Sequence, residues 1–283
     1  MSNEIKVADV DQVKELFTAL KDKMNSLKIV EIPSLKSFSE MTLDGIVWFI
    51  NGYYQGRYTL EEIQEHWSVG DYKTVTLSAM DTTYAPESHA QQSVDLVILD
   101  FNVDTLVNVT GGKTKALMTL GLKKPLNESG AFSPTYLMGC WDASNPRRDW
   151  CNITFRNALP SNLKNCVKLV KKGNYPYTTG YNYRYDGDTT DDYCWIPSSY
   201  ELGGEGAPKE YPVYYTHYHT ASNRPTYQDS NMFACTRQVN YGSDYVGSIR
   251  LIDNTGTLMA MAVRADATNL SGNPLYFMVA FAV

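Results

Sequence analysis

The stretch DDYCWIPSSYE, residues 191–201, is a short run that favours β-structure, with Trp195 at its centre and a proline followed by a polar turn at its end. A buried aromatic side chain removes about 150–250 Å² from water, so an indole in an otherwise polar third of the chain indicates a core anchor. Acidic, glycine-containing sequence precedes the stretch and glycine-rich sequence follows it. We therefore interpret this stretch as a scaffold strand and the segments beside it as loops that it displays.

The two flanking segments, 174–192 and 203–230, show neither helical nor strand periodicity. More than half of the 21 tyrosines of the chain lie between Tyr175 and Tyr227. Disordered segments are poor in aromatic residues, so this composition indicates ordered loops. Tyrosine supplies rigid contact area at low entropic cost, and its ring can stack on sugars. The candidate ligand-binding residues are Tyr177, Tyr181, Tyr183, Tyr185, Tyr215, Tyr218, Arg224 and Tyr227.

Three of these tyrosines alternate along the chain, at Tyr181, Tyr183 and Tyr185. An extended backbone would place all three side chains on one face. That face would either contact a partner or pack against the body of the domain as a half-buried strand, and both interpretations stay open.

Composition and charge restrict the classes of partner. The chain has 283 residues, of which 43% are hydrophobic and 20% charged, as in an ordinary globular protein. Its net charge of −6 gives no electrostatic footprint for nucleic acid. No apolar stretch approaches the roughly 20 residues of a membrane span, and the N-terminus lacks the apolar core of a signal peptide. We expect no nucleic-acid partner, no membrane insertion, and a chain that stays in the cytosol or leaves it by a route other than secretion.

The five cysteines are odd in number and scattered, and none forms a C-x-x-C pair. We expect buried free thiols rather than a disulfide framework or a zinc site. The cysteines are Cys140, Cys151, Cys166, Cys194 and Cys235.

The N-terminal region predicts an amphipathic helix over residues 9–24. Its apolar side chains recur at helical spacing, at Val10, Val13, Leu16, Phe17 and Leu20. The apolar stripe faces either the rest of this chain or a neighbouring copy. We expect residues 1–66 to form a helix-containing segment for attachment or oligomerisation, and residues 67–283 to form the main domain.

Several elements are predicted from local patterns. Thr59 and Glu62 have capping-box spacing and predict a short helix. Strands are expected at 73–80, 94–101, 246–252 and 258–264, with a hairpin turn at 253–256 where glycine can adopt positive φ. Residues 275–283 are apolar on both faces and predict one central strand. The expected core anchors are Trp141, Trp150, Trp195 and Phe281.

Metal and catalytic motifs are weak. Residues 186–192 resemble a calcium loop, but position twelve, where an EF-hand has a bidentate Glu, is Pro197. A looser oxygen cage and a solvated acidic turn both remain open. His217 and His219 would share one face of a predicted strand at 214–219, with Asp229 the nearest downstream carboxylate, yet two imidazoles alone do not make a metal site. The chain also lacks a G-x-S-x-G elbow and a family signature around cysteine. We expect no metal, no cofactor and no enzymatic activity.

An ordered series of sequence blocks resembles an uncharacterised domain family that is common in gut bacteria and their phages. The blocks are Trp-x-Val-Gly-Asp (67–71), Asn-Glu-Ser-Gly (127–130), Trp-x-x-Ser with an arginine (Trp141, Ser144, Arg147), Leu-Pro-x-x-Leu-Lys (159–164) and Asp-x-x-Trp-x-x-Ser-x-x-Glu (Asp192, Trp195, Ser198, Glu201), closed by a strand near Phe281. The chain departs from the pattern at Val103, where similar sequences often carry histidine. A Trp-Trp-Leu-Arg-Ser hallmark is reduced to residues 233–237, so no functional residue is carried over.

The resemblance implies an α+β, C-type-lectin-like domain with small antiparallel sheets and long irregular loops. It also implies a protein of the phage virion, assembled in the host cytoplasm, on the tail or head surface. The implied partners are other virion proteins, further copies of the chain, and a glycan or protein on the host cell. A structural decoration or baseplate protein without a ligand is an alternative. A cell-wall hydrolase or an oxidase of the sulfatase-activating type on the same fold is another, with His217, His219 and Asp229 as its thin set of titratable groups.

Overall fold

The computed structural model describes residues 9, 13–18, 33–80, 89–126, 141, 145–174, 177–178, 184–185, 189–204, 207–208, 210–226, 233–239, 248–264, 269–270 and 273–283. The chain divides into two compact units, Met1–Ser34 and Leu35–Val283. This division lies earlier than the expected one after residue 66. The reason is that helices α2 (Leu43–Tyr54) and α3 (Leu60–Gln64) bury Ile50 and Ile63 in the core of the second unit.

The described part of the first unit contains a helical turn at residues 13–18. The Val13 amide donates to the Asp9 carbonyl at 3.1 Å, which fits the predicted helix start. The side chains of Leu16 and Phe17 are 70% and 71% exposed. The other residues of the predicted helix lie outside the described part of the chain.

Helices α2 and α3 both begin at a threonine cap. The Thr42 hydroxyl accepts from the Gly45 amide at 3.1 Å and starts α2. At α3, the Thr59 amide donates to the Glu62 carboxylate at 2.7 Å, while the Glu62 amide donates to the Thr59 hydroxyl at 3.2 Å. These reciprocal bonds confirm the predicted capping box.

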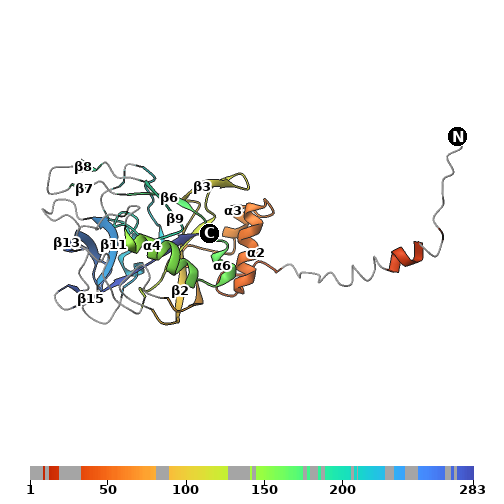
Figure 1. Ribbon diagram of the computed structural model, residues 1–283, viewed down its shortest axis with the longest axis horizontal. Coiled ribbons are helices and arrows are strands. Elements are labelled where there is room, and N and C mark those ends of the chain that lie inside the picture. Colours follow the sequence, from red (N-terminus) through yellow and green to blue (C-terminus); the bar gives the residue numbers. More distant parts are fainter. Residues whose placement is uncertain are drawn as a thin grey trace. The chain divides into compact units, whose positions relative to one another are not determined.

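The first five-stranded sheet is antiparallel throughout and has the order β1-β2-β5-β16-β10. Of these strands, β2 is labelled in Figure 1. Its strands are β1 (Tyr72–Leu77), β2 (Gln92–Phe101), β5 (Met118–Leu122), β16 (Ala280–Ala282) and β10 (Cys194–Trp195). Every residue of β5 and β16 is buried, so the middle of this sheet lies in the core. The predicted strands at 73–80 and 94–101 are confirmed as β1 and β2.

A four-stranded sheet has the order β4-β3-β6-β9, and β7 and β8 form a separate two-stranded sheet. The bounds are β3 (Thr105–Thr110), β4 (Lys113–Lys115), β6 (Val170–Gly173), β7 (Tyr177–Thr178), β8 (Arg184–Tyr185) and β9 (Thr189–Asp192). The single scaffold strand predicted around Trp195 is therefore wrong. β9 pairs with β6, whereas β10 pairs with β16 in the other sheet, and the chain changes sheets at Tyr193.

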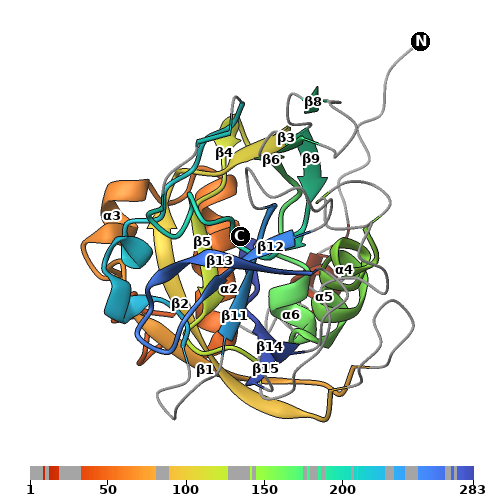
Figure 2. The same cartoon turned by 90° about the vertical axis from the view of Figure 1, so that its left-hand side faces the viewer.

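The second five-stranded sheet has the order β13-β12-β11-β15-β14 and lies in front of β5 in Figure 2. Its strands are β11 (Phe233–Val239), β12 (Ser248–Ile252), β13 (Leu258–Arg264), β14 (Asn269–Leu270) and β15 (Asn273–Phe277), and only the β11–β15 pairing within it is parallel. The predicted β12–β13 hairpin is confirmed. Its turn is fixed by the Asp253 carboxylate, which accepts from the amides of Thr255 and Thr257 at 2.9 Å each.

The final apolar run does not form the single central strand that was predicted. It divides into β15 and β16, which belong to different five-stranded sheets, with the fully buried Met278 and Val279 between them. Apolar residues on both faces indicated burial correctly, but burial is satisfied equally well by a chain that crosses from one sheet to the other.

Short helical pieces close the side of the body that carries the expected tryptophans. They are α4 (Pro146–Asp149), a π-helical segment (Trp150–Phe155), α5 (Arg156–Ala158) and α6 (Ser161–Lys164). Trp150, Trp195 and Phe281 are fully buried and Trp141 is 3% exposed, so all four expected core anchors are confirmed. The rings of Phe155 and Phe281 lie 6.5 Å apart and join the helical layer to β16.

The architecture is α+β, with few helices and several small, mainly antiparallel sheets. Among the described residues, none of the helices has the length and apolar character needed to cross a bilayer.

The β3–β4 turn depends on two glycines with positive φ. Gly111 has φ +56°, and a Cβ there would lie 1.7 Å from the Tyr54 carbonyl oxygen. Gly112 has φ +76°, but a Cβ there would meet nothing within 4 Å. Any side chain at either position would therefore be strained by the positive φ. Only at Gly111 would it also clash with the backbone of Tyr54.

Gly112→Ala should lower the free energy of unfolding by about 1–2 kcal/mol, the cost of a left-handed L-residue. Gly111→Ala should cost clearly more, because the hairpin must also move away from α2. Urea unfolding of both variants measures the difference, and equal losses would contradict the clash.

Candidate functional site

The two acidic residues that end the Asp-x-x-Trp-x-x-Ser-x-x-Glu block are both buried, and each organises its own polar network. Asp192 is 0% exposed and Glu201 is 2% exposed. Buried carboxylates are costly unless they are paired and hydrogen-bonded, so their partners define what the block does.

Asp192 ties the helical layer to β9. Its carboxylate accepts from the Trp141 indole at 2.9 Å, from the Thr190 hydroxyl at 2.7 Å and from the Asn152 amide at 2.9 Å. The Arg148 guanidinium lies 2.7 Å away as an ion pair. The Asp192 carboxylate therefore bonds to donors within the protein. Residues 186–188 of the calcium-loop candidate lie outside the described part of the chain.

Glu201 and Ser198 form a reciprocal pair at the turn after β10. The Ser198 amide donates to Glu201 Oε2 at 2.8 Å, and the Glu201 amide donates to the Ser198 hydroxyl at 3.2 Å. This is the geometry of a capping box, which explains the Ser-x-x-Glu spacing. The pair also aims the Glu201 carboxylate at the interior.

The carboxylate belongs to a group of four buried charges, which we call the buried ion cluster: Asp104, Lys172, Glu201 and Arg237. Lys172 Nζ lies 2.6 Å from Asp104 Oδ1 and 2.5 Å from Glu201 Oε1, and Arg237 pairs with Glu201 Oε2. Two carboxylates and two cations balance, so no net charge is buried. All four side chains are at most 3% exposed.

Two hydroxyl groups complete the cluster at Asp104 Oδ2. The Tyr215 hydroxyl donates to this oxygen at 3.0 Å, and the Thr119 hydroxyl also donates to it. Burial, followed by the nearby charges of Asp104 and Glu201, raises the pKa of Tyr215 well above its usual 10. Tyr215 therefore keeps its proton and acts as a donor.

The pKa of Glu201 is lowered although the residue is buried. Burial alone would raise it, but the charges of Arg237 and Lys172 and the hydrogen bonds from the same two groups outweigh that effect. Glu201 is accordingly a carboxylate inside the cluster.

Arg237 belongs to the block 233–237 that appeared degenerate in sequence. It also donates to the Ile196 carbonyl at 3.1 Å and to the Gly173 carbonyl at 3.2 Å, so one guanidinium joins β11, β6 and the segment after β10. Sequence reasoning missed Asp104, Lys172 and Arg237 as functional partners. The one available signal was the Ser-x-x-Glu spacing, which marks Glu201 but not what it contacts.

The structure divides the predicted contact residues into three groups. Tyr215 and Tyr218 are fully buried and do not fit the ligand-contact role predicted for them. Tyr218 instead donates to the Leu122 carbonyl at 3.1 Å. Arg224 is half-buried and donates to the carbonyls of Tyr218 and Gly256. The segment around these residues is thus packed onto the body.

The remaining predicted contacts are only partly described. Tyr177 and Tyr185 are paired in register across β7 and β8, which fixes their backbone positions. Tyr181, Tyr183 and Tyr227 lie outside the described residues.

His217 and His219 do not share the face of a strand, because residues 217–219 form a 3₁₀ helix. Their rings pack against tyrosines, His217 beside Tyr218 and His219 beside Tyr214. Burial, followed by the charge of Lys123, lowers the pKa of His217. Within the described ranges no group of three or more His, Cys, Asp or Glu side chains is placed to hold a metal ion, and Asp229 lies outside them.

Four cysteines are free and buried, as expected: Cys151, Cys166, Cys194 and Cys235. Burial raises the pKa of the Cys151 and Cys194 thiols, so both stay protonated at neutral pH. Cys140 lies outside the described residues.

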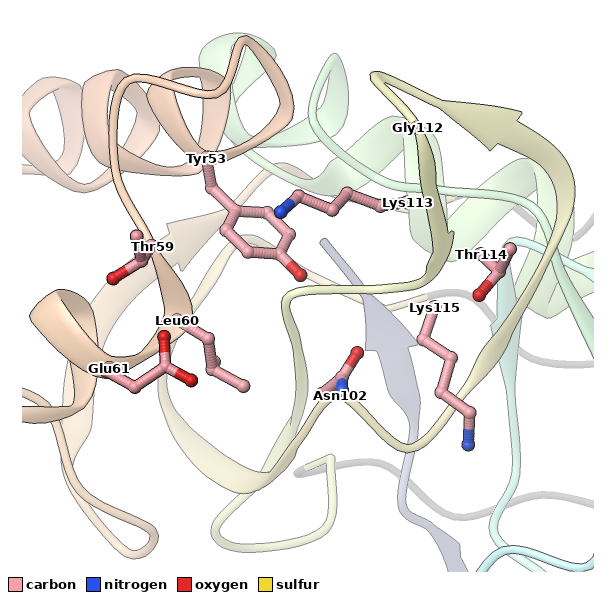
Figure 3. A pocket seen from close by; sticks show the side chains of 9 residues that line it. All are labelled: Tyr53, Thr59, Leu60, Glu61, Asn102, Gly112, Lys113, Thr114 and Lys115. Carbon is pink, nitrogen blue, oxygen red and sulfur yellow. The ribbon is translucent and has the colours of Figure 1, made fainter.

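A polar pocket of about 400 Å³ opens between the α2–α3 region and the β3–β4 hairpin (Figure 3). It is lined by Tyr53, Thr59, Leu60, Glu61, Asn102, Gly112, Lys113, Thr114 and Lys115. Figure 3 shows the Lys113 side chain pointing toward Tyr53, and its Nζ lies 4.5 Å from the centre of that ring. Lys115 points away and donates to the Val103 carbonyl at 3.1 Å.

The pocket places opposite charges on opposite walls. Glu61 extends from the first turn of α3, while Lys113 begins β4 directly after the Gly111–Gly112 turn. Burial, followed by the charge of Glu61, raises the pKa of Tyr53, which therefore presents a protonated phenol. Asn102, which also lines the pocket, adopts φ +54°, a conformation that Asn tolerates better than most residues. No sequence pattern predicts that Tyr53, Glu61, Asn102 and Lys113 line one pocket.

Removal of Arg237 should be far more costly than removal of an exposed cation. Arg237→Ala leaves Glu201 with one fewer cation in the interior and should lower the free energy of unfolding by about 3–5 kcal/mol. Lys171→Ala breaks a 3.6 Å pair with Asp191 whose side chains are 32% and 45% exposed, and should cost at most about 1 kcal/mol. Urea unfolding compares them, and a loss at Arg237 as small as that at Lys171 would show that the cluster does not hold the fold.

Comparison of the chain with protein-family models, with curated proteins and with solved structures finds no match. A site in this chain is therefore assigned from the contacts between its own residues.

Proposed function

We propose that this chain is a surface protein of a phage particle, assembled in the host cytoplasm, whose C-type-lectin-like body binds a glycan of the host cell. The observation that supports this best is the polar pocket between α3 and the β3–β4 hairpin. Its volume of about 400 Å³ is in the range of pockets that hold small ligands. The α+β body with small sheets is compatible with the lectin-like fold.

The lining of the pocket suits a ligand rich in hydroxyl groups. A sugar hydroxyl both donates and accepts, so it needs a wall that offers both functions. Glu61 supplies acceptors, Lys113 supplies donors, and the Asn102 amide supplies both. Tyr53 adds a phenol that burial keeps protonated. A single charged hydrogen bond of this kind contributes about 1.5–3 kcal/mol.

The tyrosine-rich segments would add a second contact surface. Tyr177 and Tyr185 belong to the small β7–β8 ribbon, and Tyr181 and Tyr183 lie in the sequence that connects its strands. The buried Tyr215 and Tyr218 instead hold the 210–226 segment to the body, so they support the surface without touching the ligand.

Variants of the pocket residues should distinguish glycan binding from non-specific adhesion. Lys113→Ala and Glu61→Gln should each weaken binding to cells and to isolated polysaccharides of gut bacteria by about 10-fold or more, since 1.4 kcal/mol corresponds to a factor of ten. Lys124→Ala, at an exposed lysine that does not line the pocket, should bind like the unmodified protein. Binding is measured with labelled protein on cells and on a glycan array.

A variant with Tyr181, Tyr183 and Tyr185 all changed to Ala tests the second surface in the same assays. Loss of binding in this variant alone would show that the ligand contacts the tyrosine-rich loops and not the pocket. Binding that is absent from the unmodified protein on every cell type and glycan would reject the adhesin proposal.

A purely structural role on the particle is the second candidate, and the exposed apolar residues of the first unit favour it. Leu16 and Phe17 lie on one helical turn and are 70% and 71% exposed. Such a turn would associate with further copies of the chain or with another virion protein.

Leu16→Ser combined with Phe17→Ser should convert an oligomer of the full chain into a smaller species, because the shared apolar contact is lost. Glu15→Ser, on the same turn, should leave the assembly unchanged. Light scattering after gel filtration measures the mass of each species. A monomeric unmodified chain, or an oligomer that the double variant retains, would contradict this role for the turn.

A further inference from the structure

The buried ion cluster brings together an amine and a carboxyl group in a geometry that suits bond formation. Lys172 Nζ is 2.6 Å from Asp104 Oδ1, and the two side chains are 0% exposed. The atom that Nζ would attack is Cγ, which is bonded to Oδ1, so the amine already lies beside its target carbon. Reacting atoms in productive geometries are about 3–3.5 Å apart. The Trp195 ring, whose centre is 4.2 Å from Nζ, covers the amine and helps to keep water out.

We propose that Lys172 and Asp104 condense to an intramolecular isopeptide bond, with Glu201 as the proton carrier. The Nζ–Cγ bond forms and the Cγ–Oδ1 bond breaks. Oδ1 leaves as water with the two protons that the ammonium group gives up, so no oxidant, reductant or further reactant is needed. This inference does not depend on glycan binding.

Glu201 is placed to make the amine nucleophilic. Its Oε1 lies 2.5 Å from Nζ, while its other oxygen, Oε2, is held by the Ser198 amide and by Arg237. Glu201 takes one proton from Nζ, which frees the lone pair that attacks Cγ, and then returns that proton to Oδ1 as it leaves. The carboxylate ends in the charge state in which it began.

The other oxygen of Asp104 is prepared for negative charge. When nitrogen adds to Cγ, charge develops on Oδ2, which receives hydrogen bonds from Tyr215 at 3.0 Å and from Thr119. Two fixed donors aimed at one oxygen form the arrangement that stabilises a tetrahedral intermediate. The same donors hold the carbonyl oxygen of the amide that results.

The charge balance of the cluster also fits the reaction. Condensation removes one positive and one negative charge together, and Glu201 and Arg237 remain as a buried pair. No charge is left without a partner, which would be costly in the interior. The exposed Lys171–Asp191 pair lacks these features: its atoms are 3.6 Å apart and solvent reaches both side chains.

The intact mass of the full chain decides the proposal. The unmodified protein should be lighter than its sequence mass by one water molecule, and proteolysis followed by tandem mass spectrometry should yield one branched peptide that joins Lys172 to Asp104. Lys172→Arg should have its full sequence mass. Lys171→Arg is the matched control and should keep the loss of water.

Two further variants test the roles of the other groups. Asp104→Asn should lose ammonia in place of water and reach the same final mass as the cross-linked protein. Glu201→Gln should slow the cross-link by about 100-fold or more in a time course after cell-free synthesis, the usual contribution of a positioned acid–base group.

A cooperatively folded, unmodified protein with its full sequence mass would overturn the proposal, even if the Lys172 variant does not fold. A loss of water that maps to a linear peptide, such as an imide at Asp186–Gly187, would overturn it as well.

Discussion

Four side chains in the interior, two carboxylates and two cations, contact one another where the sheets meet. Asp104 precedes β3, Lys172 lies on β6, Glu201 follows β10, and Arg237 lies on β11. These elements belong to three different sheets, so the cluster fixes how the sheets meet. Removing each charge from water costs free energy, and the opposite charges beside it offset that cost. The arrangement therefore tolerates little rearrangement of any one strand.

The same framework holds the 210–226 segment against the body. Tyr215 is part of the cluster through Asp104, and Tyr218 is bonded to the strand end at Leu122. Arg224 then fastens the same segment to the β12–β13 turn through Gly256. The polar pocket lies outside this framework, on the β3–β4 hairpin and the start of α3, where side chains can meet a ligand without disturbing the interior.

Local interactions are the ones that sequence patterns predicted well. The Thr59–Glu62 capping box and the turn at Asp253 each involve residues within four positions of each other, and both are confirmed. Alternation and apolar content also located β1, β2 and β13 correctly. These features are set by neighbours in the chain, so a short window contains the information.

Contacts between distant residues were not predictable in this way. Asp104 and Lys172 are 68 residues apart, and no pattern around either one indicates the other. The run before Val283 signalled burial, yet its division between two sheets depends on partners elsewhere. His217 and His219 had strand-like alternation, but they lie in a 3₁₀ helix whose Tyr218 bonds to the distant Leu122 carbonyl. The pocket is likewise assembled from α2, α3, a loop and β4.

The position of β16 between β5 and β10 has a kinetic consequence. β5 ends at Leu122, and its neighbour β16 begins only at Ala280, so the middle of the first sheet is closed by the pairing that is most distant in sequence. Pairings of high contact order form slowly. A nascent chain that has already released β1, β2 and β5 from the ribosome must hold an apolar strand edge open while the intervening residues are translated. During that interval it would be a natural client for a chaperone that shields unpaired strands.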